Sequence, residues 1–499
     1  MALTPGGSLN SVPASRKQTL NTNYLDFTSG ANDWAQQYLP DLMEKEAEVF
    51  GPRTISGFLS QVGAEESMTS DQVIWSEQSR LHLSYTGTAQ PAGDVNGTIT
   101  ILADIDGDTT VGATASRTHG IRVNDMLLIA QAGVVVKALA VETPDSNVVS
   151  VEPYATAALS TLSAAACTIL VIGSEFGKGA SYADETGTFK ADGRGANEPT
   201  FKSFNNKPII MKDYYEISGS DVSRIGWVEV ASEDGASGYM WYLKAEADTR
   251  ARFNDHLEMT MLEAEKTAAA SIIGFGANSQ VRGAADAGLN GAGTEGLFAA
   301  IESRGNVTSG VTGVNAATDL AEFDAILAEF DKQGAIEENM MFVNRATSLA
   351  MDDMLASMNS YGAGGTSYGV FNNSEDMALN LGFSGFRRGS YDFYKSDMRY
   401  LNDKATRGGI NDAAGSAAIR GIIVPAGTST VYDQMLGKNL KRPFLHVRYR
   451  ASQTDDRKMK TWVTGSVGAA TSALDAMQIH MLSERCLVTQ GANNFMLMK

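Results

Sequence analysis

The side chains of this sequence best suited to acid–base catalysis or metal binding are its histidines, and their spacing supports neither role. None lies in a His-Glu-x-x-His motif or in another spacing that brings zinc ligands together. His256 and Glu258 are two residues apart, so on a helix they would point to different faces. We therefore predict that His256 is an exposed helix residue. The histidines are His82, His119, His256, His446 and His480.

No motif for nucleophilic catalysis or phosphate binding has the context that its chemistry needs. The pattern Gly-x-Ser-x-Gly occurs at Gly365-Thr-Ser-Tyr-Gly369, but it lies in a glycine-rich stretch and not at the turn from a strand to a helix that a nucleophilic serine requires. Gly362-Ala-Gly-Gly365 lacks the lysine of a phosphate-binding loop. Gly274-Phe-Gly276 follows a predicted helix, whereas a dinucleotide-binding loop must follow a strand, so we interpret it as a helix stop. We assign no catalytic, cofactor-binding or metal-binding residue and predict that the protein is not an enzyme.

Two further groups of residues could bind a metal. Asp104, Asp106 and Asp108 alternate around Gly107 and could offer oxygens to calcium, but the later glycine and the final glutamate of an EF-hand loop are absent. A solvated turn between strands is the favoured interpretation. Cys167 and Cys486 are the only cysteines and are too few for a disulfide framework or a thiolate site, so we predict buried free thiols in a reducing compartment.

Size and composition limit the remaining classes. A chain of 499 residues is too long for one compact core and suggests two to four lobes. Its formal net charge of −18 argues against a dedicated nucleic-acid binder, because phosphate contact depends mainly on lysine and arginine. The uncharged run 154–174 has the length of a membrane span but is diluted by serine, threonine and alanine, so we predict no membrane contact.

The longest ordered element is expected from about Glu233 to Ile273. Apolar residues recur there at steps of three and four, no proline interrupts them, and charged residues occupy the opposite face. A helix of this kind would be on the order of 50 Å long, and it cannot bury its apolar stripe without packing on a sheet. The predicted stripe consists of Met240, Leu243, Ala247, Ala251, Leu257, Met261 and Ala264.

An alternating pattern predicts a strand over 72–85, which should project from a core. Short apolar runs separated by turn residues then predict an inserted antiparallel barrel or sandwich, of an SH3-like or OB-like kind, over 93–173. A second extended stretch, 200–218, should pair with 72–85 as a long hairpin that carries the inserted unit.

A second lobe is expected around the helix 319–332, the buried strand 340–343 and a helix that begins at Thr347 or Ser348. Asp319 is the predicted cap of the first of these helices. In the last third, 473–482 is expected to be helical and 485–489 to form a strand that returns to the first lobe.

This order of parts resembles the major capsid proteins of tailed bacteriophages. Gly57 to Gln78 is similar to the segment that leads into the hairpin of crAss-like and related podovirus capsid proteins. Met341-Phe-Val-Asn-Arg-Ala-Thr-Ser348 is similar to a strand-to-helix turn in the axial lobe of many capsid proteins. The resemblance implies an α+β, Hong Kong 97-type capsid fold, with an N-arm, an extended hairpin loop, a spine helix, peripheral and axial lobes, and an inserted β-barrel-like domain.

The resemblance also implies a division of the chain. The expected parts are an N-terminal arm (1–32), an N-terminal helix with the extended hairpin loop (33–92 and 174–232), the inserted β domain (93–173), the spine helix with the peripheral lobe (233–318), the axial lobe (319–437) and a return to the peripheral lobe (438–499). The short arm leaves no room for a cleaved scaffolding segment, so a separate scaffold is expected. No lysine and asparagine are assigned to a covalent crosslink.

Hexamers and pentamers of such a protein would close into an icosahedral virion shell around packaged double-stranded DNA, assembled in the bacterial cytoplasm. The implied partners are further copies of the chain, a portal protein, a scaffold and decoration or head proteins, with DNA as an indirect partner. Three other classes stay open: an encapsulin-like nanocompartment shell, a tail or surface structural protein, which would show repeats, and a hydrolase with a β insert, which would need a pair of carboxylates.

Overall fold

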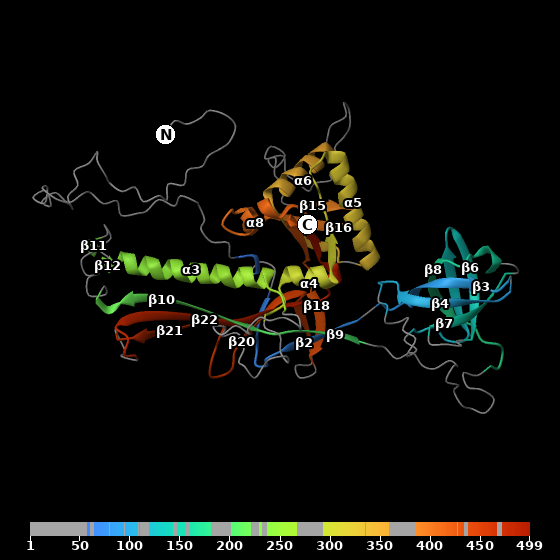
Figure 1. Cartoon of the computed structure of the whole chain (residues 1–499), viewed down its shortest axis with the longest axis horizontal. Helices are drawn as coiled ribbons and strands as arrows, with labels where there is room; N and C mark the ends of the chain where they lie inside the picture. Colours follow the sequence, from blue (N-terminus) through green and yellow to red (C-terminus); the bar gives the residue numbers. More distant parts are fainter. Residues whose placement is uncertain are drawn as a thin grey trace, which may run out of the picture. The chain divides into compact units, whose positions relative to one another are not determined.

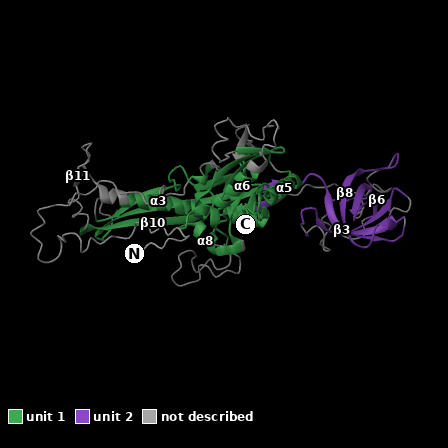
Figure 2. Ribbon diagram, turned by 90° about the horizontal axis from the view of Figure 1, so that it is seen from above, with its two compact units in different colours: residues 1–75, 205–499 green, residues 76–204 purple. Residues whose placement is uncertain are grey.

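The computed structural model separates the chain into two compact units (Figure 2). One comprises residues 1–75 and 205–499, and the other comprises 76–204. We describe each unit by itself. The described residues are 57–499 except for the gaps 60–63, 79, 94, 108, 110–118, 143–146, 156–158, 181–200, 221–228, 232–236, 267–292, 335, 359–384, 427, 434–437 and 467–471. The expected N-terminal arm (1–32) and the first part of 33–92, up to residue 56, therefore lie outside the described residues.

The smaller unit contains a closed antiparallel barrel in the strand order β3-β4-β7-β6-β5-β8. Alternate residues of each strand point inwards and form a core of their own around Ile101, Leu127 and Ile169, all fully buried. The predicted inserted β unit is therefore a barrel. Its strands are β3 (Ser84–Pro91), β4 (Gly97–Asp104), β5 (Asp125–Gln131), β6 (Val134–Glu142), β7 (Val148–Pro153) and β8 (Ala166–Ser174).

The strand expected over 72–85 is two strands. β2 (Val73–Gln78) ends before the barrel, whereas Tyr85 belongs to β3 and is buried in the barrel core. Leu81, between them, is 89% exposed. The alternation of apolar and polar residues across 72–85 thus comes from two separate strands. The chain passes from the larger to the smaller unit within this segment.

The long hairpin expected from the sequence is only partly present. β2 pairs with β9 (Phe201–Asn206), and we call this pair the ribbon. β10 (Ile209–Ser218) does not continue it but pairs over its whole length with β22 (Ala476–Thr489). The helix predicted over 473–482 is therefore wrong, because β10 and β21 (Lys460–Gly465) hold those residues in a sheet from both sides.

A five-stranded sheet underlies the long helix in the larger unit (Figure 1). Its path is β1-β20-β22-β10, and β21 pairs with β22. β1 (Ala64–Met68) runs parallel to β20 (Leu445–Arg450), and the other pairs are antiparallel. Segments far apart in the sequence thus meet in one layer.

The long helix α3 spans Met240–Glu263, shorter than predicted. Its 24 residues correspond to about 36 Å. Ser237–Tyr239, expected inside the helix, form strand β12, which pairs with β11 (Glu229–Ala231). The buried face uses Phe253, Leu257 and Met261 against β10 and β22, whereas Ala247 of the predicted stripe is exposed. The expected stop at Gly274 and Gly276 lies outside the described residues.

The larger unit also contains a six-stranded sheet, in the order β13-β23-β17-β14-β16-β15. Its residues alternate between two cores: Met341 and Val343 pack with helices α5 and α6, and Phe342 packs on the opposite face with α3 and α4. The strands are β13 (Asn306–Thr308), β14 (Glu338–Val343), β15 (Gly385–Arg388), β16 (Tyr391–Asp397), β17 (Gly421–Pro425) and β23 (Met496–Met498).

The helices of this unit include α4 (Leu297–Arg304), α5 (Ala316–Gln333) and α6 (Arg345–Met358). A side chain caps α5, and another caps α6, where the Asn344 side-chain oxygen accepts the Thr347 N–H, whereas Gly296 before α4 offers no side-chain cap. Asn315, not Asp319, caps α5 by accepting the Thr318 N–H. Asp319 is buried in the first turn and accepts the Gly313 N–H. The remaining elements are η3 (Leu159–Thr161), α7 (Arg399–Asn402), α8 (Arg407–Ala414), η6 (Gly415–Ala417), β18 (Thr428–Asp433), β19 (Lys438–Pro443) and η7 (Ala492–Asn494).

Candidate functional site: two polar anchors beside the long helix

The histidines do not come together. His119 and His446 are buried in different units, His82 and His256 are exposed, and His480 stacks between Tyr214 and Trp462 on the five-stranded sheet. The exposure predicted for His256 is confirmed. Within the described residues, no three His, Cys, Asp or Glu side chains converge in a way that could hold a metal ion.

The other candidate ligands have ordinary structural roles. Asp106 receives the Arg80 guanidinium at 2.8 Å instead of pointing into an oxygen cage, while Asp108 lies outside the described residues. Both cysteines are free and buried, as predicted, and burial raises the pKa of the Cys486 thiol to about 12, so it stays protonated. None of the described helices is both long and apolar enough to span a membrane. The glycine runs at 274–276 and 362–365 lie outside the described residues.

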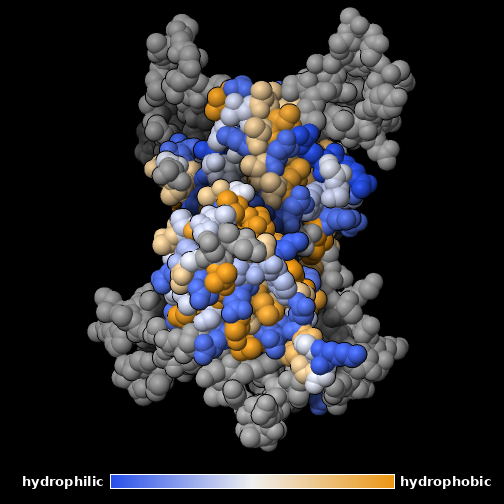
Figure 3. Space-filling model, turned by 90° about the vertical axis from the view of Figure 1, so that its right-hand side faces the viewer, coloured by the Kyte–Doolittle hydropathy of each residue, from blue (hydrophilic) through white to orange (hydrophobic). Residues whose placement is uncertain are grey.

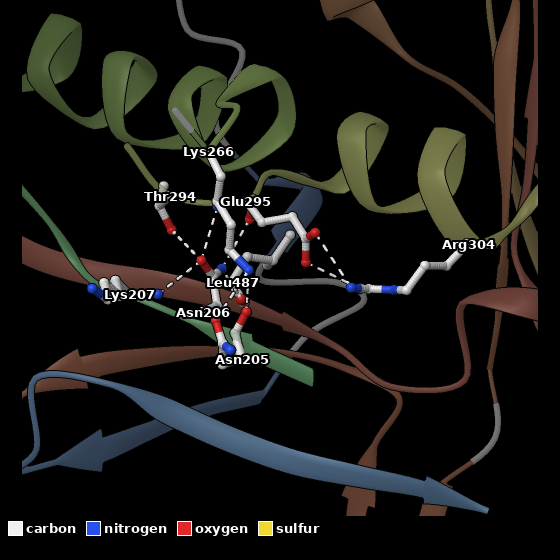
Figure 4. A network of polar contacts seen from close by, with 8 residues as sticks. All are labelled: Asn205, Asn206, Lys207, Lys266, Thr294, Glu295, Arg304 and Leu487. Carbon is white, nitrogen blue, oxygen red and sulfur yellow. Dashed lines mark hydrogen bonds and ion pairs between the residues drawn. The ribbon is translucent and has the colours of Figure 1, made fainter. Parts of the chain in front are cut away.

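The most extensive polar network that we find in the larger unit surrounds the root of the ribbon, and we call it the ribbon junction (Figure 4). Its hub is Asn206, the last residue of β9, which is fully buried. The Asn206 side-chain nitrogen donates to the carbonyl oxygens of Glu295 at 3.0 Å and Leu487 at 2.6 Å. Its side-chain oxygen accepts from the Thr294 hydroxyl and from the N–H groups of Glu295 and Lys207. One amide thus joins β9, the loop before α4, and β22.

An ion pair and an aromatic ring extend the junction to the other ribbon strand. Arg304 and Glu295 are paired at 3.0 Å and both side chains are nearly buried. The Arg304 guanidinium lies 5.7 Å from the ring centre of Trp75 in β2, a cation–π contact. The Lys266 ammonium, just past α3, contacts the backbone carbonyl of Asn205. Both ribbon strands are therefore held at their roots.

A second polar group, the helix anchor, holds the segment 57–59. Glu258 of α3 is 7% exposed, and its carboxylate accepts the N–H groups of Gly57 at 2.7 Å and Leu59 at 3.1 Å. The ring of Phe58 packs edge-on against Phe342 of β14 at 4.6 Å. This segment is thereby fixed between the long helix and the six-stranded sheet. Burial raises the pKa of Glu258, and the backbone N–H bonds oppose that rise without cancelling it.

The raised pKa of Glu258 predicts a pH-dependent stability. Between the ordinary and the raised pKa, the folded chain binds a proton at Glu258 that the unfolded chain has lost, so this contribution to stability falls as pH rises. We expect the difference in unfolding free energy between the wild type and Glu258→Gln to decrease through that window and to be constant above it. Denaturant unfolding at a series of pH values measures this difference.

The control for this titration is Glu265→Gln, which removes an exposed carboxylate just past the same helix. A difference between wild type and Glu258→Gln that does not change with pH would contradict the assignment.

Sequence reasoning did not find either anchor. Trp75, Asn206 and Arg304 are far apart in the chain, and each is an ordinary residue of its local pattern. Glu258 was considered only for its spacing from His256. The one usable signal is Asn206, a polar residue at the end of a strand. Its burial indicates a hydrogen-bonded site, but that burial becomes evident only when the partner strands are known.

Among known proteins, the chain is similar to solved structures but matches no protein-family model and no curated protein. Among solved structures, it is similar to a chain of Microbacterium phage Oxtober96, with 10% identity and a TM-score of 0.36 over 95% of this chain and 99% of that chain. A chain of Mycobacterium phage Bobi has 7% identity and a TM-score of 0.35, over 91% and 94%.

A third structure is the asymmetric unit of the bacteriophage PhiM1 mature capsid, with 9% identity and a TM-score of 0.29 over 61% of this chain and 76% of that chain. All three structures come from bacteriophages. Since their TM-scores lie below 0.5, the function has to be argued from this chain's own residues.

Proposed function

We propose that this chain is the major capsid protein of a tailed bacteriophage, with a Hong Kong 97-type fold, and that its copies form the hexamers and pentamers of an icosahedral shell around packaged double-stranded DNA. The sequence resemblance to crAss-like and related podovirus capsid proteins belongs to the same proposal. The expectation that the protein has no enzymatic activity also remains a prediction.

The observation that carries the proposal is the anchored ribbon beside the long helix. Asn206 and Arg304 fix the roots of two strands that lead to an independent barrel, while α3 lies on a sheet assembled from distant segments. A shell subunit needs such a combination, because extended arms must reach neighbouring copies while their roots stay fixed to a rigid body.

The proposal assigns a role to each part. The five-stranded sheet with α3 corresponds to the peripheral lobe, the six-stranded sheet with α5 and α6 to the axial lobe, the ribbon to the extended loop, and the barrel to the inserted domain. Residues 1–32 are proposed as the arm. The proposed partners are further copies of the chain, a portal protein, a scaffold, and decoration or head proteins. The proposed location is the virion, after assembly in the bacterial cytoplasm.

Electron microscopy of the purified full chain, expressed alone and with its neighbouring genes, tests the function. We expect closed shells, tubes or hexameric rings. Because the chain carries a formal net charge of −18, assembly should strengthen as salt screens the repulsion between copies. A monodisperse monomer at every salt concentration, with no particles under coexpression, would overturn the proposal.

A further inference from the structure

The barrel has one apolar outer wall, formed by the neighbouring strands β6, β5 and β8. Strand register sets its outward side chains in cross-strand rows: Leu128 lies between Lys137 and Leu170, Ala130 lies beside Val135, and Met126 lies beside Leu139. Val135 is 59% exposed and Ile172 is 50% exposed. We call this surface the apolar wall; its members are Met126, Leu128, Ala130, Val135, Leu139, Leu170 and Ile172.

The other side of the barrel has a different character. The outward residues of β3, β4 and β7 are mostly threonines and serines, with Leu102 as a single exposed leucine. A barrel that faced only water would have no reason to differ between its two sides, because its core is filled from inside by other residues. Figure 3 shows apolar residues lying among hydrophilic ones on the face turned toward the viewer.

The charges of the apolar wall are few and complementary. Lys137 is the only charged side chain among the outward positions of 126–130, 134–139 and 166–172 in its three strands. Glu152 of β7 lies beside Leu139 in the neighbouring register, at the edge of the wall. Within the part of the chain that the structure describes, neither Lys137 nor Glu152 forms an ion pair, and both residues are exposed.

We propose that the apolar wall binds the apolar wall of a second copy of this chain in a two-fold contact. In such a contact, Lys137 of each copy lies against Glu152 of the other copy. The two-fold symmetry thus produces two equivalent ion pairs. The wall also lacks the carboxylates that make two copies of this acidic chain repel each other elsewhere. This inference depends on the proposed shell function for the supply of neighbouring copies.

Isotope-mixed crosslinking tests the contact in the full chain. Subunits labelled with ¹⁵N and unlabelled subunits are assembled together, treated with a zero-length carbodiimide and digested, and peptides that join Lys137 to Glu152 are identified by mass. We expect pairs that contain one peptide of each isotope. Pairs of a single isotope only, or Lys137 joined only to another protein, would overturn the proposal.

Matched variants separate a contact from a general loss of folding. Val135→Asp places a charge in the wall and should lower the yield of mixed pairs about tenfold, whereas the same substitution at Leu102, which is 51% exposed on the other side, should leave it unchanged. The exchange Lys137→Glu with Glu152→Lys should retain the crosslink. Particles without mixed pairs would refute the contact between walls but not the shell function. Mixed pairs without particles would support the contact and contradict the shell function.

Discussion

Replacement of Asn206 by leucine is expected to lower the free energy of unfolding of the larger unit by about 4 kcal/mol, because several groups lose a buried hydrogen-bond partner at once and each such loss costs about 1–3 kcal/mol. The carbonyl oxygens of Glu295 and Leu487 and the Thr294 hydroxyl all bond to the Asn206 amide, in a site with no exposure at Asn206. Leucine has the same number and branching of side-chain heavy atoms as asparagine, so the substitution leaves no cavity and removes the hydrogen bonds. Denaturant unfolding measures it.

The same variant should loosen the ribbon. Hydrogen exchange at the N–H groups of β9 should accelerate in Asn206→Leu, since the end of that strand would no longer be tied to β22 and the loop before α4. Asn205→Ala is the matched control: its side chain is exposed, and substitution there should change stability by no more than about 0.5 kcal/mol. Equal effects of the two variants would show that the junction contributes little.

Truncation of Phe323 to alanine should cost about 4 kcal/mol, the usual range for a phenylalanine removed from a filled core. Phe323 of α5 is fully buried, and its ring centre lies 5.5 Å from that of Phe386 and 5.2 Å from that of Phe393. The helix therefore depends on this ring for its contact with β15 and β16. Loss of the tyrosine and tryptophan near-ultraviolet circular dichroism at lower denaturant concentration would measure the effect.

Leu349→Ala is the control for Phe323. Leu349 lies on α6 and is 53% exposed, so its truncation should change stability by no more than about 0.5 kcal/mol. A loss below about 1 kcal/mol for Phe323→Ala would mean that the surrounding rings refill the cavity, and the aromatic cluster would then not explain how the helix is held.

Local sequence patterns predicted those elements whose neighbours are close in the chain. The barrel strands alternate because each has one face in a core made by adjacent segments, and α5 shows its apolar stripe for the same reason. The failures occur where distant strands decide the outcome. Ala476 to Leu482 contain residues that suit a helix, but β10 and β21 supply hydrogen bonds on both sides and override that preference.

The anchors were unpredictable for a related reason. An asparagine at the end of a strand reads as a turn residue, and only the fold shows that Asn206 is enclosed by Glu295 and Leu487. The predicted start of α5 at Asp319 failed at shorter range: Asp319 has the right chemistry for a cap, but Asn315 reaches the first turn earlier and Asp319 binds the Gly313 N–H instead.

The two strands that complete the sheets of the larger unit come after almost all other residues in the chain. β22 is the central strand of one sheet, and β23 pairs with β13 and β17 in the other. During synthesis, the barrel strands from Ser84 to Ser174 are available long before. The barrel can therefore fold while the ribosome is still working, whereas the five-stranded sheet cannot close before Thr489 has emerged and the six-stranded sheet cannot close before Met498. Until then the larger unit lacks strands of its sheets, so under the proposed function an unfinished chain could not join a shell.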